Sequence, residues 1–139
     1  MIRPARSSDR SELRDIQQSL REPNPPLLEY AIEGPPLLLV STADGEPVGY
    51  ALVFYDDETG YVAELAVLPS HRREGRASRL LAAIFERLRD EGCKRVSLSV
   101  HPDDEAAQQF YGSLGFETTG REPDYYEDGS EAVVMEHDL

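Results

Sequence analysis

Apolar residues recur along the chain at two different spacings, and the change of spacing separates predicted strands from predicted helices. In the first half, three short apolar runs follow one another, divided by turn residues at positions 44–45 and 57–60. Runs of this length between turn signals predict an antiparallel meander. The three strands are expected at Leu37 to Thr42, Val48 to Tyr55 and Tyr61 to Val67.

In the second half, two segments have apolar residues at every third or fourth position, which predicts two helices. The first extends from Ala77 to Glu91 and is followed by a helix-ending glycine, Gly92. The second begins at an aspartate cap, Asp103 or Asp104, and is ended by Gly115. We expect its inner face to carry Ala106, Ala107, Phe110, Tyr111 and Leu114.

Apolar residues alternate with serines from Val96 to Val100, which predicts a strand between these helices. Two more strands are expected at Phe116 to Gly120 and Ala132 to His137. This order predicts strand–helix–strand crossovers in the second half of the chain. We therefore expect one domain over residues 1–139, of α+β class, with a mixed central sheet of about six or seven strands and about four helices.

The N-terminal segment gives a short strand, a helix and a loop. Ile2 to Ala5 predicts the strand, and Asp9 with Glu12 three residues later predicts a capping box at the start of the helix. Five prolines fall in residues 21–36, so this segment is expected to be a loop with one helical turn around Leu28 to Ile32. The apolar face of the helix is expected to carry Leu13, Ile16 and Leu20.

Composition adds a strongly acidic charge balance. The 139 residues include 27 Asp and Glu against 14 Lys and Arg, a formal net charge of −13. Nucleic acids and anionic membranes are polyanions, so neither is expected as a partner. Lys94 is the single lysine, and an acid excess with so little lysine indicates adaptation to high salt; an ordinary acidic enzyme is the alternative.

A single cysteine, Cys93, leaves no disulfide framework and no cysteine-based metal site, which favours a reducing compartment. The start of the chain has no apolar run resembling a signal peptide, and no stretch approaches the roughly 18 to 20 apolar residues of a membrane span. We expect a cytoplasmic protein, monomeric or homodimeric, that binds no metal.

One short turn concentrates the positive charge, HRREGRASRLL at residues 71–81. Its first nine residues hold four arginines and one glutamate, a net +3, which leaves −16 on the rest of the chain. The turn lies between a predicted strand and a predicted helix, where unpaired N–H groups and the helix dipole attract anions. Gly75 allows a ligand to approach the backbone closely, and Ala77 keeps the next step small.

These features predict an anion site suited to a pyrophosphate. A surface turn whose arginines balance nearby acids is the alternative. Only one glycine is present and no Gly-Lys-Ser/Thr follows, so neither a dinucleotide fingerprint nor a P-loop is indicated.

The same turn carries a family resemblance. Its Arg72-x-x-Gly75-x-Ala77, preceded by LAVLP, resembles the acyl-CoA loop of the GNAT N-acetyltransferases. A second resemblance, to the family's strand and capped helix, lies in SVHPDDEAAQQFYGSLGF. A third, to the ending of the protein N-terminal acetyltransferases, including those that act on ribosomal proteins, lies in EPDYYEDGSEAVVMEHDL. The resemblance covers about Val48 to Leu139 and implies a GNAT fold with acetyl-CoA as co-substrate.

The resemblance implies where acetyl-CoA would bind. Backbone groups of Leu65, Ala66 and Val67 would hold the pantetheine arm in a splayed gap of the sheet, and the Val67 N–H would donate to the acetyl oxygen. The family usually has an asparagine against the cofactor where this chain has Asp104. The pyrophosphate would be held by Arg72, Arg73, Glu74, Gly75, Arg76, Ala77 and Ser78.

It also implies residues for catalysis and for the acceptor. Tyr111 would protonate the departing CoA thiolate, and Tyr125 and Tyr126 would lie over the acceptor. Ser99 stands where related N-terminal acetyltransferases carry a glutamate or histidine as base.

The base is therefore sought among neighbouring residues, and Glu64 and Tyr61 are the candidates, with His101 behind them. Glu64 interrupts an otherwise apolar strand, where a buried carboxylate needs a partner. A position facing solvent from an outer strand is the alternative for Glu64.

The expected function is transfer of an acetyl group from acetyl-CoA to a primary amine, foremost the N-terminal α-amino group of a protein. An α-amino group has a pKa of about 7.7 to 8.0, so a modest base suffices, whereas a lysine side chain at about 10.4 demands more. Two alternatives stay open. One is a polyamine or aminoglycoside acetyltransferase, which the acidic surface also suits, and the other is a non-catalytic acyl-CoA-binding module.

Overall fold

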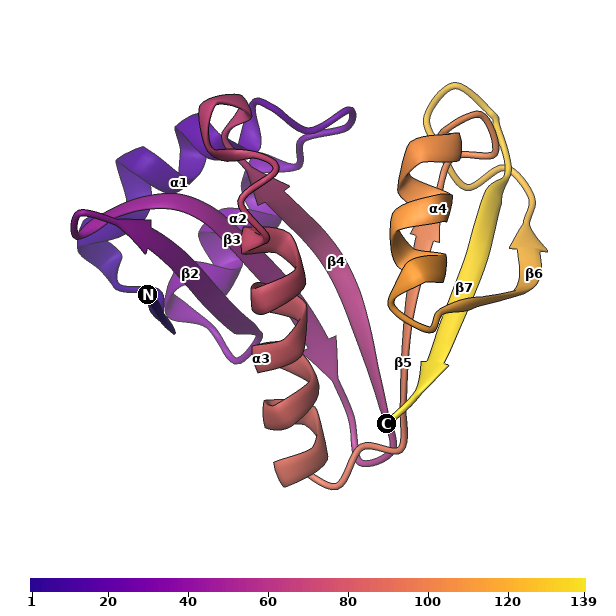
Figure 1. Ribbon diagram of the computed structural model, residues 1–139. Helices are drawn as coiled ribbons and strands as arrows, with labels where there is room; N and C mark the ends of the chain where they lie inside the picture. Colours follow the sequence, from indigo (N-terminus) through magenta and orange to yellow (C-terminus); the bar gives the residue numbers. More distant parts are fainter.

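Seven strands form one mixed sheet in the computed structural model, which describes residues 1–139 (Figure 1). The strands are β1 (Ile2–Pro4), β2 (Leu37–Ala43), β3 (Glu46–Tyr55), β4 (Thr59–Val67), β5 (Arg95–Val100), β6 (Glu117–Glu122) and β7 (Ala132–Asp138). The helices are α1 (Arg10–Gln17), α2 (Pro25–Glu33), α3 (Arg76–Asp90) and α4 (Glu105–Ser113), with 3₁₀ turns at Ser7–Asp9 and Pro69–His71. The predicted α+β class, with a mixed sheet and four helices, is confirmed.

The sheet has the order β1-β2-β3-β4-β5-β7-β6 and consists of two antiparallel halves. The first half is the predicted meander of β2, β3 and β4 with β1 at its edge, and in the second half β7 lies between β5 and β6. A short parallel pairing of β4 with β5 joins the halves, through Thr59–Arg95, Gly60–Val96 and Tyr61–Ser97. Beyond this pairing the two strands diverge, as the V between them in Figure 1 shows.

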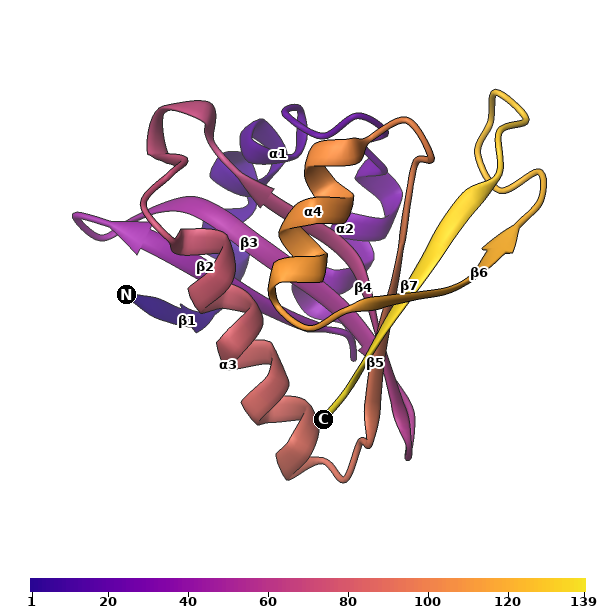
Figure 2. The same ribbon diagram turned by 45° about the vertical axis from the view of Figure 1, so that its right-hand side comes forward.

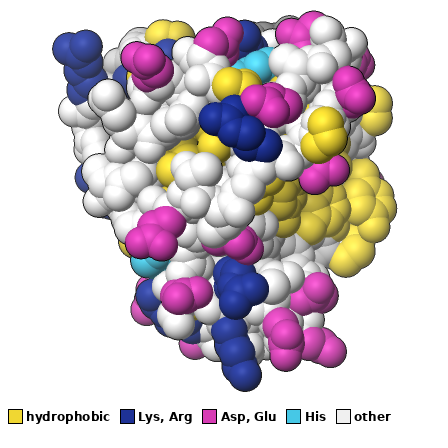
Figure 3. Space-filling model, turned by 90° about the vertical axis from the view of Figure 1, so that its right-hand side faces the viewer, with side chains coloured by type: hydrophobic (Ala, Val, Ile, Leu, Met, Phe, Trp, Pro, Cys, Tyr) yellow, Lys and Arg dark blue, Asp and Glu magenta, His cyan; other side chains and the backbone are white.

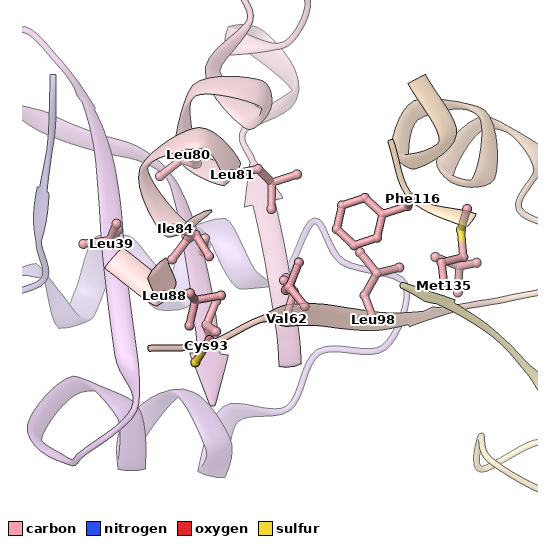
Figure 4. Packing of buried hydrophobic residues seen from close by; sticks show 14 of the residues in the cluster. Leu39, Val62, Leu80, Leu81, Ile84, Leu88, Cys93, Leu98, Phe116 and Met135 are labelled. Carbon is pink, nitrogen blue, oxygen red and sulfur yellow. The ribbon is translucent and has the colours of Figure 1, made fainter. Parts of the chain in front are cut away.

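Helices cover both faces of the sheet (Figures 1 and 2). On the face of α3 and α4, the leucines of α3 point onto the strands, while Leu98, Phe116 and Met135 extend the same cluster beyond β4 (Figure 4). Each fully buried leucine stabilises the fold by about 1.5–3 kcal/mol, so α3 is firmly anchored. None of the helices has the length and apolar character needed to cross a bilayer. The buried apolar helix residues are Leu80, Leu81, Ile84 and Leu88 on α3, and Leu13, Ile16, Leu28 and Ala31 on α1 and α2.

A β-bulge in β4 decides which side chains face which helices. Two adjacent residues of β3 pair with Glu64 and Val62, so Ala63 between these two is the extra residue. Val62 packs in the cluster beneath α3, whereas Ala63 packs in the cluster beneath α1 and α2. If side chains alternated strictly along β4, Glu64 would face α3, as Val62 does. The extra residue shifts the alternation by one, so the Glu64 side chain faces α1 instead.

The proline-rich segment contains a helix, and the prediction of a loop with one helical turn was wrong. The helix α2 spans Pro25–Glu33 and buries Leu28 and Ala31. Its prolines occupy the first two positions, where helical N–H groups have no partner anyway. The Asn24 side chain caps this end by accepting a hydrogen bond from the Leu27 N–H at 3.3 Å. Proline here starts a helix rather than preventing one.

The predicted capping box of Asp9 with Glu12 was also wrong, because the Asp9 carboxylate is used elsewhere. It accepts hydrogen bonds from the Arg3 guanidinium at 2.8 and 2.9 Å and from the Arg6 N–H at 2.8 Å. Asp9 is only 5% exposed, and the Arg3 hydrogen bonds hold the pKa of its carboxyl below the usual range. The pair ties β1 to the start of α1.

Replacing Asp9 by Asn should lower the free energy of unfolding by about 1–3 kcal/mol at neutral pH, since a buried charge-assisted pair is lost. Because the folded pKa of Asp9 is lowered, this contribution is present above the unfolded pKa and disappears as the pH falls through the folded value. Urea unfolding at a series of pH values should show the two proteins converging in acid. Asp15→Asn, an exposed carboxylate on α1, is the control and should change stability little at any pH.

Candidate active site

The divergence of β4 and β5 leaves a cavity of about 570 Å³, lined by the end of β4, the turn before α3 and the inner side of α4. We call it the arginine pocket, after Arg72, Arg73 and Arg76 in its lining. No acidic side chain lines it. Among the residues predicted to bind the cofactor, Glu74 does not line the pocket. Those that do are Leu65, Ala66, Val67, Arg72, Arg73, Gly75, Arg76, Ala77 and Ser78.

A second cavity of about 1060 Å³ lies between β4 and β5 and is bordered by three loops. We call it the acidic cleft, after Glu22, Glu64, Asp104 and Glu127 in its lining. The predicted catalytic and acceptor residues all line it: Tyr61, Glu64, Tyr111, Tyr125 and Tyr126. Both cavities are lined by Leu20, Leu65, Ala107 and Tyr111. The two cavities therefore meet end to end. A ligand in one cavity can thus reach a ligand in the other and transfer a chemical group to it.

The turn before α3 presents backbone N–H groups to the arginine pocket. Arg73 and Gly75 both have left-handed backbone conformations, with φ of 63° and 76°, which reverse the chain just before the helix. The first bond of this turn of α3 runs from the Arg79 N–H to the Gly75 carbonyl at 3.0 Å. The N–H groups of residues 76–78 thus have no partner within the helix, which is the arrangement that binds phosphate.

The four arginines of this turn have different partners. The Arg72 Nε donates to the Val67 carbonyl at 3.0 Å. Arg76 donates to Glu74 at 2.8 Å and to Ser41 and Thr42 of β2, and this pairing lowers the pKa of Glu74. Arg73 and Arg79 form no ion pair within the protein. The alternative, that nearby acids balance the arginines of this turn, thus applies to Arg76, while Arg72 and Arg73 line the pocket without an acidic partner.

The end of β4 directs one backbone N–H into the gap. The Leu68 N–H donates to the Val48 carbonyl of β3 at 2.8 Å. Because neighbouring residues of a strand direct their N–H groups to opposite sides, the Val67 N–H points away from β3 and toward the gap. The Val67 carbonyl, in the next peptide unit, points to the same side and accepts from Arg72, while the Val67 N–H stays free to act as an oxyanion donor.

Tyr111 stands where the two cavities meet. Asp104 caps α4 by accepting from the Ala107 N–H at 3.0 Å, and this cap sets the helix so that Ala107 and Tyr111 face the cavities while Ala106, expected on the inner face, is exposed. The Tyr111 ring packs edge-on against Phe116. Burial raises the pKa of Tyr111 to about 12, and its hydroxyl has no partner within the protein. Tyr111 is thus a neutral phenol with a proton to give.

Glu64 is buried, and the alternative that it faces solvent was wrong. Its carboxylate accepts from the Gln17 Nε2 at 3.0 and 3.2 Å and from the Tyr50 hydroxyl at 2.9 Å. Gln17 Nε2 also donates to the Asn24 carbonyl, which ties α1 to the start of α2. Burial raises the pKa of Glu64, although both donors pull it down. Gln17 was not predicted as a site residue; its position on the apolar side of α1, beside Leu13, was the available signal.

The acceptor side of the cleft contains two aromatic pairs. The Tyr61 hydroxyl contacts the Ser99 Oγ at 3.3 Å and the Tyr125 hydroxyl at 2.5 Å, and burial raises the pKa of Tyr61. Tyr126 stacks on His101 with ring centroids 3.7 Å apart and an interplanar angle of 10°. Burial raises the pKa of Tyr126 to about 12. The residues predicted for the acceptor thus lie together in the cleft. Ser99, at the position where related enzymes carry a base, accepts a hydrogen bond from the Tyr61 hydroxyl.

Comparison with known proteins accounts for this arrangement. A profile of the Acetyltransferase (GNAT) family matches residues 5–116, which is most of the chain. The chain belongs to the GNAT acetyltransferase family. This acetyltransferase is 33% identical over 150 residues to the N-terminal acetyltransferase A complex catalytic subunit ard1 of Schizosaccharomyces pombe, with 99% of the chain and 85% of the relative aligned.

Solved structures share the same fold. Ard1 from Thermoplasma volcanium superposes with a TM-score of 0.91 at 29% identity, over 100% of this chain and 97% of that one. The ribosomal-protein-S18-alanine N-acetyltransferase from Escherichia coli superposes with a TM-score of 0.88 at 23% identity, over 100% and 93% of the two chains. The protein is accordingly an N-acetyltransferase with acetyl-CoA as co-substrate. The alternative of a non-catalytic acyl-CoA-binding module is set aside.

Replacing Gly75 by Phe should weaken CoA binding by more than about 10-fold, because a side chain at this left-handed residue would meet Arg79 and crowd the N–H groups at the start of α3. Isothermal titration calorimetry gives the affinity, and circular dichroism checks the fold. Gly45→Phe is the matched control, since Gly45 has a φ of 83° with open space around it and does not line either cavity. An unchanged affinity for CoA would remove the turn from the cofactor site.

Proposed function

We propose that this enzyme acetylates the N-terminal α-amino group of proteins. The meeting of the two cavities at Tyr111 carries the proposal, because it gives the cofactor and the acceptor separate entrances to one reacting point. The acidic cleft is larger than a single amine needs and is bordered by loops on three sides, which suits the first residues of a peptide. The relative ard1 is named as the catalytic subunit of an N-terminal acetyltransferase.

The residues divide the reaction between them. Leu65, Ala66 and Val67 hold the acyl arm, and the Val67 N–H donates to the acetyl oxygen as negative charge develops there. Arg73 and the N–H groups at the start of α3 bind the pyrophosphate. Tyr111 gives its proton to the departing thiolate, which produces free CoA. Tyr125 and Tyr126 border the acceptor and keep bulk water from the reacting amine.

Glu64 is the base that the geometry favours. Burial raises its pKa, which brings this carboxylate closer to the pKa of an α-ammonium group and makes it a stronger base than an exposed glutamate. Tyr61 is the weaker candidate, because a raised phenol pKa keeps it protonated at neutral pH and its hydroxyl is engaged by Ser99 and Tyr125. We assign Tyr61 to orienting the acceptor, and Glu64 to accepting the proton of the amine, directly or through water.

A panel of acceptors tests the proposed function. Purified enzyme with acetyl-CoA should release CoA with N-terminal peptides, and mass spectrometry should place the acetyl group on the α-amine rather than on a lysine side chain. The Tyr111→Phe variant should bind acetyl-CoA normally but should turn over about 100-fold more slowly. Acetylation that is equally fast with this variant would therefore be uncatalysed transfer from acetyl-CoA. Tyr30→Phe, an exposed tyrosine outside both cavities, should be as active as the wild type. Acetylation of polyamines or aminoglycosides alone would favour the small-amine alternative.

Replacing Glu64 by Gln should remove the part of the acidic limb of the rate–pH profile that comes from Glu64, while protonation of the acceptor amine itself still lowers the rate in acid. Because the pKa of Glu64 is raised, the wild-type rate should fall as the pH drops through this raised value and the base becomes protonated. The variant should be slower, by about 100-fold at neutral pH, and should lack this part of the limb. Glu46→Gln, at an exposed position on β3, is the control. A profile identical to that of the wild type would exclude Glu64 as the base.

A further inference from the structure

We propose that the acidic cleft selects protein N-termini that carry a lysine or arginine directly after the reacting residue. The inference rests on the proposed function and names the substrate class of the same site. Its first support is the unequal charge of the two cavities, since the arginine pocket is lined by no acid and the acidic cleft by four acids and a single arginine, Arg21. Figure 3 shows the face that lies on the right in Figure 1, where acidic side chains are scattered among a few Lys and Arg side chains.

The one arginine of the cleft is already neutralised. The two Arg21 amino groups donate to the two carboxylate oxygens of Asp103 at 2.7 and 3.1 Å, a bidentate pair between the α1–α2 loop and the β5–α4 loop. Such a pair leaves little positive charge to attract an anionic acceptor. An acidic residue near the acceptor amine would therefore meet carboxylates without a free cation.

Three loops each contribute one carboxylate to the cleft. Glu22 comes from the α1–α2 loop, Asp104 from the β5–α4 loop and Glu127 from the β6–β7 loop. None of the three forms an ion pair with an arginine or lysine of the chain. The carboxylates thus surround one opening from different directions, and their charges add there.

A buried histidine beside Glu22 lacks a partner. His101 is 7% exposed, its Nε2 makes no hydrogen bond, and this nitrogen lies 3.6 Å from the Glu22 carboxylate. The stack with Tyr126 fixes the ring against the cleft. In the tautomer that carries its proton on Nδ1, Nε2 is an unused acceptor next to a carboxylate. In that tautomer an ammonium or guanidinium group donates to both at once and also supplies the positive charge that the carboxylate lacks, whereas an acidic side chain does neither.

The position of this pair relative to the reacting point sets the selectivity. The amine reacts at the junction of the two cavities, which Leu65 and Tyr111 both line, and Glu64, the neighbour of Leu65 on β4, lies on the acidic-cleft side of this junction. Glu22 and His101 line the acidic cleft alone, beyond this junction. A peptide that places its terminus at the junction extends into the acidic cleft, and we infer that its second residue reaches Glu22 and His101 in the lining of that cleft.

The test uses three peptides that differ only after an N-terminal alanine, Ala-Lys, Ala-Gln and Ala-Glu, with acetylation mapped to the α-amine. At about 50 mM salt, kcat/KM should be at least about 10-fold higher for the lysine peptide than for the glutamate peptide. The ratio should shrink at about 1 M salt, where the Debye length falls to about 3 Å. Glu22→Gln and, separately, Glu127→Gln should reduce the ratio several-fold, whereas Glu12→Gln, an exposed change of equal charge on α1, should preserve it.

The outcomes separate this inference from the proposed function. Efficient α-amine acetylation with equal kcat/KM for the three peptides, or a preference for the glutamate peptide, would leave the function standing and overturn the selectivity. A lysine preference that neither glutamate variant alters would also overturn it, because the selecting charge would then lie elsewhere. If no peptide is acetylated while a polyamine is, the proposed function fails and the inference fails with it.

Discussion

The parallel pairing of β4 with β5 ends after three residue pairs, and the cavities of the candidate active site exist because the two strands separate there. Buried backbone groups need partners, so two strands that diverge inside a protein must be satisfied by something other than each other. The Arg72 side chain satisfies the Val67 carbonyl, while the Val67 N–H is left for a ligand. Helices α3 and α4 share one apolar cluster across the opening, which holds the two halves of the sheet apart at a fixed distance.

Charge is sorted along the same gap. A chain with a net charge of −13 places its exposed arginine turn at one end of the passage, and carboxylates without basic partners at the other. In the proposed mechanism, this distribution of charge would draw an anionic cofactor and a cationic amine to opposite entrances, with Tyr111 where they meet. The general acid excess of the surface does not extend into the arginine pocket, because no acidic side chain lines it.

Most features set by local sequence were predicted correctly, apart from the helix α2 and the Asp9 cap, whereas features set by distant contacts were not. The meander, α3 and the turn at Gly75 follow from short-range periodicity and backbone conformation, which the sequence displays directly. The bulge at Ala63 depends on how β4 is registered against β3, so the burial of Glu64 could not be settled from its own strand. Gln17 resembles any polar residue of an amphipathic helix, and its role requires Glu64, 47 positions away in the chain. The roles of these residues in catalysis remain predictions for the assays above.

Two buried carboxylates show how the same burial can serve stability or chemistry. Asp9 is held by the Arg3 guanidinium, so its charge is compensated and its pKa is lowered. Glu64 is held by two neutral donors, Gln17 and Tyr50, which fix the carboxylate in place but supply no compensating cation. Its pKa therefore stays raised. A carboxylate that is held in place but poorly stabilised in its charged form has the properties of a base. Glu64 differs from a structural ion pair because both of its hydrogen-bond donors are neutral.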